Sequence, residues 1–184
     1  MIPRNRTTNI GSPTPGANNP AYWSQTATPL GRLYIATNNQ GLCAIKFGRL
    51  EPDLETISGP HPGRDREINL ANLVCKQLHE YFSMRRRVFD LPLDLSALTP
   101  FQAEVLAATS RIPWGEAWSY QRVASELARP KSSRPVGQAL GRNPIPIIIP
   151  CHRVIASDGT LGGYCGKVGL DLKRWLLRHE GTQL

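Results

Sequence analysis

The residues with the clearest chemical potential are a cysteine and a histidine at neighbouring positions, Cys151 and His152. They follow an apolar run, residues 145–150, that contains two prolines, Pro146 and Pro150. A continuous apolar run predicts a buried segment, whereas prolines within it are incompatible with a regular central strand. We therefore expect an extended, irregular piece of the core that ends at the thiol.

A thiol in such a place needs help to react. Burial raises the pKa of a cysteine, and the thiolate is the nucleophile, so a base must lie within reach. His152 is the obvious base. Successive side chains of an extended backbone point to opposite faces, so the two groups can meet only if the chain turns or a water bridges them. The alternative is a structural cysteine with a chance histidine neighbour, because buried free cysteines are common.

The composition is that of a globular protein with a polyanionic partner. The chain has 184 residues, 40% of them hydrophobic and 20% charged, which allows one domain or two small ones. A net charge of +8 favours nucleic acid as the partner. The four cysteines show no paired spacing, which is typical of a reducing compartment. No secretory or membrane-spanning pattern is recognised, and we expect a cytoplasmic, nucleoid-associated protein.

The first half of the chain predicts a small sheet with a helix. Residues 1–20 are rich in Pro, Asn, Gly and Thr, which is typical of a disordered tail. A helix over 65–84 has its apolar residues at helical spacing and should cover a sheet. Residues 88–95 favour a further strand or a linker, and we place the first domain at 21–95. Turn sequences separate three predicted strands that form an antiparallel meander, at residues 22–27, 33–37 and 42–47.

The second half, residues 96–184, predicts helices and irregular loops. Thr99-Pro-Phe-Gln102 is a capping box that starts a helix. Two short helices follow, at 120–127 and from Ser133 to Gly141, and their tight connection indicates a helix-turn-helix. Residues 119–153 contain six Lys or Arg residues against one acid.

The second of these short helices is poorly suited to reading bases in a major groove. Gly137, Gln138 and Ala139 offer few side chains that could form bidentate contacts with a base edge. Small side chains do allow the backbone to approach a narrow groove closely.

Taken together, several motifs resemble the O6-alkylguanine-DNA alkyltransferase family, the methylated-DNA–protein-cysteine methyltransferases. The resemblance is close over residues 99–181 and looser over 22–98. It implies an α+β fold with an N-terminal ribonuclease-H-like domain and a C-terminal winged-helix-like domain that carries the site. The motifs that carry it are Pro150-Cys-His-Arg-Val-Ile155, Gly141-Arg-Asn-Pro144, Ser119-Tyr-Gln121, Arg134-Pro-Val-Gly137 and Trp175-Leu-Leu-Arg-His-Glu-Gly181.

The resemblance also implies a DNA repair reaction. A monomer would flip O6-alkylguanine, or O4-alkylthymine, out of duplex DNA and transfer the alkyl group irreversibly to Cys151. His152 would take the thiol proton through a water, and Glu180 would orient and charge-balance the imidazole. Asn143 would keep Cys151 in place. Tyr120 would donate a proton or hydrogen bond to the leaving guanine.

Substrate and DNA contacts carry over in the same way. Arg134 would enter the base stack in place of the flipped nucleotide. Tyr164 and the backbone of Val154 and Cys165 would line the base pocket. The second short helix would contact double-stranded DNA from the minor groove. The residues implied at the DNA are Ser133, Arg134, Pro135, Gly137, Gln138 and Arg142.

This sequence departs from the family pattern at three places. Pro135 follows Arg134, and because a residue before proline avoids helical dihedrals, we expect Arg134 to be the N-cap. The segment between Tyr164 and Trp175 is two residues longer than the usual pattern, which should alter the pocket lid. Cys165 would place a second thiol close to the acceptor.

No cofactor or metal is expected. The sequence contains no glycine-rich nucleotide fingerprint. Cys75 and His79 lie one helical turn apart, and Cys43 and His61 are also present, but this spacing fits no zinc pattern.

Three other classes of protein compete with the repair hypothesis. A lesion-binding, non-catalytic relative would lack the cysteine, whereas Cys151 and Glu180 are both present. A cysteine hydrolase would need an oxyanion hole and would leave the basic charge unexplained. A helix-turn-helix transcription factor would require better base-reading side chains and no reactive thiol.

Overall fold

The computed structural model describes residues 21–48, 63–164 and 169–183. The predicted tail over 1–20 and the predicted pocket residue Cys165 lie outside the described residues. Within the described part of the chain, no helix combines the length and apolar character that crossing a membrane requires.

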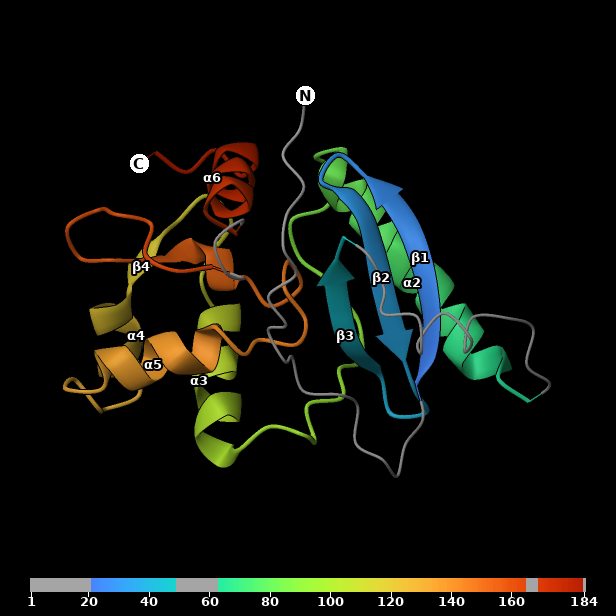
Figure 1. Cartoon of the computed structure of the whole chain (residues 1–184), viewed down its shortest axis with the longest axis horizontal. Helices are drawn as coiled ribbons and strands as arrows, with labels where there is room; N and C mark the ends of the chain where they lie inside the picture. The colour runs from blue at the N-terminus through green and yellow to red at the C-terminus, as the bar shows by residue number, and fades with distance from the viewer. Residues whose placement is uncertain (1–20, 49–62, 165–168, 184) are drawn as a thin grey trace, which may run out of the picture.

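The N-terminal half is the predicted meander with its helix. β1 (Tyr22–Thr28), β2 (Gly31–Thr37) and β3 (Leu42–Phe47) form an antiparallel sheet in the order β1-β2-β3. Helix α2 (Asp65–Phe82) runs along this sheet (Figure 1). It ends two residues before the expected position because Met84 has a φ of 62°, a left-handed conformation that a helix cannot continue through.

The segment after α2 is a linker rather than a strand. Its single ladder contact is with Leu42, whose N–H donates to the Pro92 carbonyl at 2.8 Å and whose carbonyl accepts from the Asp94 N–H at 2.9 Å. The Asn38 amide also donates to the Asp94 carboxylate at 2.6 Å. At Gly41 a Cβ would lie 2.6 Å from the Pro92 oxygen, so only glycine allows the linker to approach the sheet this closely.

The C-terminal half consists of short helices around the Cys151 segment. Helix α3 (Pro100–Ser110) begins at the predicted capping box of Thr99 and Gln102, and Ser119 caps α4 (Tyr120–Glu126) as expected. A two-stranded parallel pair, which the sequence did not predict, joins the start of α4 to the segment after Cys151. The elements are α3 (Pro100–Ser110), β4 (Trp118–Ser119), α4 (Tyr120–Glu126), α5 (Ser133–Leu140), η1 (Cys151–Arg153), β5 (Val154–Ile155) and α6 (Gly169–His179).

One prediction about α5 is wrong. Ser132, not Arg134, is the N-cap, and Arg134 is the second helical residue. Pro135 is tolerated inside the first turn because backbone N–H groups there have no intrahelical acceptor. The disfavoured helical conformation before a proline is therefore accepted at Arg134.

A single cluster of buried apolar side chains connects the two halves. It contains Ile35 and Leu78 from the sheet and its helix, and Val105 and Leu176 from the helical half. The Ile45 N–H of β3 also donates to the Pro144 carbonyl at 2.8 Å, just before the Cys151 segment. The segment that carries Cys151 is thus held by both halves of the chain, and the sheet helps to position it.

Gly41→Ala should destabilise the protein, because the added methyl group must displace backbone of the linker. We expect a loss of about 1–3 kcal/mol in the free energy of unfolding, measured by urea titration. Gly163→Ala is the matched control, since a Cβ there meets nothing within 4 Å. Equal stability of the two variants would contradict the close approach at Gly41.

Candidate active site

The chain turns at Cys151 instead of continuing extended. Cys151, His152 and Arg153 form a short 3-10 helix and all three are buried. The run before it is irregular as predicted. Ile147 has a φ of 75°, which is strained for a β-branched residue, and the Ile149 N–H closes a turn onto the Ile145 carbonyl at 3.0 Å. This turn removes the geometric obstacle that an extended backbone would place between the thiol and the imidazole.

Asn143 holds the turn and the thiol together. Its amide nitrogen donates to the Cys151 sulfur at 3.0 Å and to the Ile149 carbonyl at 2.9 Å. Its amide oxygen accepts from the Ile145 N–H at 3.0 Å. All the hydrogen-bonding groups of this side chain therefore serve the segment that presents Cys151.

The thiol is protonated at rest. Burial raises the pKa of Cys151, and hydrogen bonds from Asn143 and Tyr164 together with the charge of Lys173 only partly offset it. A base must therefore remove the proton during reaction.

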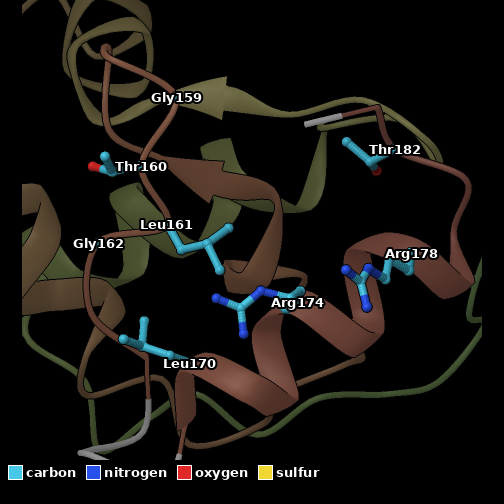
Figure 2. Close-up of a pocket in the computed structure, with 8 residues that line it drawn as sticks. All are labelled: Gly159, Thr160, Leu161, Gly162, Leu170, Arg174, Arg178 and Thr182. Atoms are coloured by element: carbon cyan, nitrogen blue, oxygen red, sulfur yellow. The ribbon is translucent and has the colours of Figure 1, made fainter.

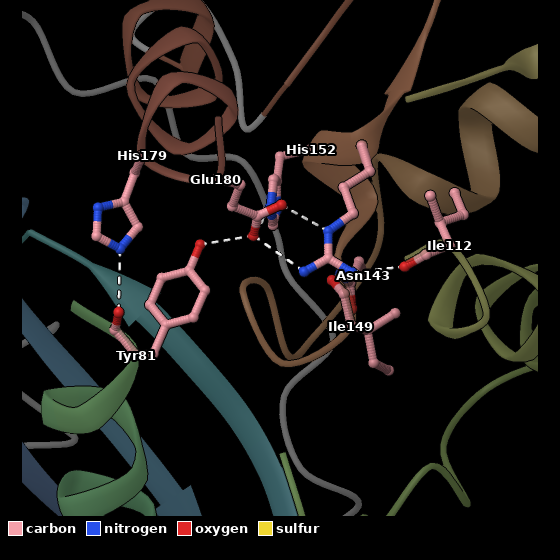
Figure 3. Close-up of polar contacts among 8 residues, drawn as sticks. Tyr81, Ile112, Asn143, Ile149, His152, His179 and Glu180 are labelled. Atoms are coloured by element: carbon pink, nitrogen blue, oxygen red, sulfur yellow. Dashed lines mark hydrogen bonds and ion pairs between the residues drawn. The ribbon is translucent and has the colours of Figure 1, made fainter. Parts of the chain in front are cut away.

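Glu180 is the hub of the buried polar groups (Figure 3). Its Oε1 accepts from the His152 Nε2 at 2.8 Å and from the Tyr81 hydroxyl at 2.8 Å. Arg153 contacts both oxygens, with Nε 2.7 Å from Oε2 and Nη2 3.0 Å from Oε1. Burial alone would raise the pKa of Glu180, but the contacts with His152 and Arg153 outweigh it and lower the pKa to about 2.

The end of α6 places Glu180 in this position. Gly181 has a φ of 76°, its N–H donates to the Arg178 carbonyl at 3.0 Å, and the Thr182 N–H donates to the Leu177 carbonyl at 2.9 Å. This is the glycine-dependent helix termination that the sequence predicted. It fixes Glu180, which directly follows the last residue of α6, in a buried position.

His152 is poised to accept a proton. Its pKa is lowered, chiefly by burial, so the ring is neutral. Because Glu180 is ionised, Nε2 carries the hydrogen that faces it, and Nδ1 carries the lone pair. Nδ1 is buried and has no hydrogen-bond partner among the described residues. It is therefore free to take a proton from Cys151, directly or through a water.

Tyr120 and Lys173 complete the surroundings of the thiol. Burial, and then the nearby Cys151, raise the pKa of Tyr120, so its hydroxyl is a donor. Lys173 is fully buried; its ammonium group lies 5.8 Å from the Tyr120 ring centroid and donates to the carbonyls of Val154, at 2.5 Å, and Leu161. No pattern in the sequence singles out Lys173, because its position is that of an ordinary helical lysine.

The helix-turn-helix meets the thiol site at Tyr120. A Cβ on Gly137 of α5 would lie 3.6 Å from the Tyr120 ring, and one on Gly162 would lie 2.8 Å from its hydroxyl. Tyr120 is thus enclosed between α5 and the loop that follows β5. On α5 and just beyond it, four of the predicted DNA contacts are exposed to solvent: Arg134, Pro135, Gln138 and Arg142.

Of the predicted site residues, the structure brings one group together and keeps another apart. Tyr164 is buried near the thiol, and Val154 follows directly in β5. Arg134 is exposed at the start of α5 and belongs to the surface rather than to the buried cluster. The group around the thiol consists of the buried Cys151, His152 and Glu180 and the partly buried Asn143 and Tyr120.

A separate pocket of about 630 Å³ lies between the loop after β5 and helix α6 (Figure 2). Arg174 and Arg178 of α6 line it, and Arg174 pairs with Asp171 at 2.7 Å. Gly162 of the loop also borders it, but Cys151 does not. This pocket therefore backs the loop that encloses Tyr120 and is distinct from the thiol cluster.

The site and the fold together define a protein with a buried cysteine nucleophile next to a helix-turn-helix. Comparison with known proteins identifies it further. Residues 21–95 match the ribonuclease-like domain of 6-O-methylguanine DNA methyltransferase, and residues 100–182 match the DNA binding domain of the same family. The chain belongs to the methylated-DNA–protein-cysteine methyltransferase family, as its motifs predicted.

Individual relatives agree with this assignment. The Salmonella typhimurium methylated-DNA–protein-cysteine methyltransferase is 41% identical over 164 residues, covering 86% of this chain and 94% of the relative. A crystal structure of Mycobacterium tuberculosis O6-methylguanine methyltransferase is 37% identical with a TM-score of 0.73, covering 88% and 93% of the two chains. A structure of the Mycobacterium tuberculosis protein in complex with DNA is 38% identical with a TM-score of 0.72, covering 86% and 92%.

Glu180→Gln should destabilise the folded protein, because the substitution leaves Arg153 buried without its counter-ion. We expect a loss of about 3–5 kcal/mol in the free energy of unfolding at pH 7. The folded pKa of about 2 lies below the ordinary 4.5, so the charge of Glu180 stabilises the parent above pH 4.5. That contribution is lost as the pH falls from 4.5 to 2, and the glutamine variant should lack it.

Urea titrations between pH 7 and 2 measure both effects. Glu104→Gln is the control, because Glu104 pairs with Arg129 at the surface and its loss should cost less than about 1 kcal/mol. A Glu180→Gln variant as stable as Glu104→Gln would contradict the role of the buried carboxylate.

Proposed function

We propose that this protein repairs alkylated DNA by moving the alkyl group of O6-alkylguanine, or of O4-alkylthymine, onto its own Cys151. The observation that carries the proposal is the position of His152, whose Nε2 is held by the buried Glu180 and whose buried Nδ1 has no hydrogen-bond partner among the described residues. A buried thiol with a raised pKa and an adjacent neutral base suits one activated displacement. Membership of the family and the match to its DNA binding domain support the same conclusion.

The reaction balances with residues of this chain alone. The thiol proton passes to His152 Nδ1, the sulfur of Cys151 attacks the alkyl carbon, and the bond between that carbon and the guanine O6 breaks. Glu180 stabilises the imidazolium that forms. The Tyr120 hydroxyl donates a hydrogen bond to the departing guanine, because expelling a guanine anion unaided is costly, and the proton held on His152 then passes to the guanine so that both leave the reaction neutral. The thioether product is stable, so each molecule reacts once.

The target base must leave the duplex to reach Cys151. We place α5 in the minor groove, where Gly137 allows close approach and Ser133, Arg134, Pro135, Gln138 and Arg142 contact the DNA. Arg134 would fill the gap left by the flipped nucleotide, and Tyr164 and the Val154 backbone would line the base pocket. The protein would act as a monomer, with residues 21–95 and 96–184 as its two domains, and would be found with DNA in the cytoplasm.

The direct test is the mass of the protein after reaction with excess methylated duplex. We expect one added methyl group per chain, located on Cys151 by peptide mapping, and no product beyond one equivalent. Cys151→Ser should bind the duplex as the parent does but gain no mass, because a hydroxyl is far less acidic than a thiol. Turnover beyond one equivalent, or a methyl group on Cys165, would contradict the proposal.

Arg134→Ala should slow reaction with alkylated duplex without harming the thiol chemistry. Flipping costs a few kcal/mol of stacking, part of which an inserted guanidinium recovers, so we expect a rate about 10- to 100-fold lower. A free alkylguanine base should react equally fast with the variant and the parent. Single-turnover rates on both substrates make the comparison.

Arg129→Ala is the control for this variant, since Arg129 is exposed in the same basic region but pairs with Glu104. Equal slowing of Arg134→Ala on the duplex and on the free base would mean that Arg134 supports the pocket, and its assignment to flipping would be wrong.

A further inference from the structure

Tyr81 reaches the thiol cluster from the other half of the chain. It lies in the last turn of α2, is fully buried, and donates its hydroxyl hydrogen to Glu180 Oε1 at 2.8 Å. Figure 3 shows this hydroxyl pointing at the carboxylate that also meets His152. The reaction proposed above assigns no task to Tyr81.

Contacts other than the one with Glu180 also hold Tyr81 in place. Its ring packs against Phe82, Phe89, Trp114 and His179, with centroids 5.1–5.5 Å apart. The His179 Nε2 also lies 3.0 Å from the Tyr81 backbone carbonyl. The neighbouring side chains thus fix the ring and the backbone of Tyr81, and this fixes the position of its hydroxyl relative to Glu180.

The donors on Glu180 are divided unequally between its two oxygens. Arg153 contacts both oxygens, which fixes the carboxylate in position. Tyr81 and His152 both donate to Oε1. A hydrogen bond from one donor draws charge from the oxygen and so weakens its attraction for another. Tyr81 therefore reduces the charge that Glu180 offers to His152.

We propose that Tyr81 is a positioning residue that sets, through Glu180, how strongly a proton is held on His152. Alkyl transfer would then depend on the packing of α2 against α6, which places the Tyr81 hydroxyl. The inference rests on the proposed function. Its hydroxyl touches neither the thiol nor the alkylated base, and it acts through the carboxylate alone.

The proposal gives a pH dependence with a definite sign. His152 must be neutral to accept the thiol proton, so the rate falls as the pH drops through the pKa of His152. Without the Tyr81 hydroxyl, more negative charge remains on Oε1 and the imidazolium is more stable. The acid limb of the pH–rate profile, in which the rate falls as His152 becomes protonated, should then move to higher pH. A stronger hydrogen-bond donor at position 81 should move this limb to lower pH.

Other charged and titratable groups around this pair are unchanged by a substitution at position 81. Lys173 and Arg153 both disfavour the imidazolium, and Glu180 favours it. The groups that face the pair are Tyr81 from α2, Cys151 and Arg153 from η1, Lys173 and His179 from α6, and Glu180 itself.

The experiment measures single-turnover methyl transfer from methylated duplex against pH, with the thermal midpoint in parallel. For Tyr81→Phe we expect the acid limb to move up by about 0.5–1 pH unit, equivalent to about 0.7–1.4 kcal/mol. Tyr34→Phe removes a hydroxyl from a buried tyrosine of the sheet and should leave the limb in place. A folded Tyr81→Phe variant with the parent limb would overturn the proposal, even if its thermal midpoint falls.

A second substitution keeps the test decisive if Tyr81→Phe does not fold. Site-specific 3,5-difluorotyrosine at position 81 retains the ring and the hydroxyl but makes it a stronger donor. We expect the acid limb to move to lower pH, and an unchanged or raised limb would overturn the proposal. A parent protein that fails to react with methylated duplex would instead refute the proposed function, so the two failures are distinguishable.

Discussion

The structure depends on one buried negative charge, the carboxylate of Glu180. A carboxylate in the interior is costly unless it is paired and hydrogen-bonded, and removing one partner of such a pair is strongly destabilising. Here the donors come from α2, through Tyr81, and from η1, through His152 and Arg153. Arg153 in turn donates to the Ile112 carbonyl at 2.6 Å, which ties in the segment after α3. Parts of the chain that are far apart in sequence are held together at this charge.

The same constraint explains how a buried cysteine can be both protected and reactive. Burial raises the pKa of Cys151, so the resting thiol is a poor nucleophile toward chance electrophiles. The neutral His152 is the proton acceptor, and the ionised Glu180 is already in place as the counter-ion of the imidazolium that forms when the proton moves. Asn143 and the strained turn at Ile147 hold the sulfur in place for that step.

Local features of the sequence predicted local structure well. The turn sequences defined the meander, Thr99 and Gln102 marked the start of α3, and Gly181 marked the end of α6. The motif around Cys151 selected the family. The prolines near the thiol indicated an irregular backbone but not the direction of its turn, because that direction is set by Asn143 and by packing on β3.

Long-range partners could not be predicted in the same way. Tyr81 and Arg153 read as a core aromatic and a basic-segment arginine, since their shared acceptor Glu180 lies far along the chain. Lys173 lies on α6 and Glu180 directly follows it, and in the sequence alone both resemble ordinary charged residues of a helix and its end. Arg134 was misplaced because the rule for residues before proline ignores the freedom of the first helical turn.

The central claim is that resting His152 is neutral, with its hydrogen on Nε2 facing Glu180 and its lone pair on Nδ1. Nitrogen-15 NMR of the histidine side chains at pH 7 measures this directly, with His152 assigned by comparison with a His152→Gln variant. The account predicts a pyrrole-type Nε2 and a pyridine-type Nδ1 for this ring. An imidazolium, or a hydrogen on Nδ1, would contradict it.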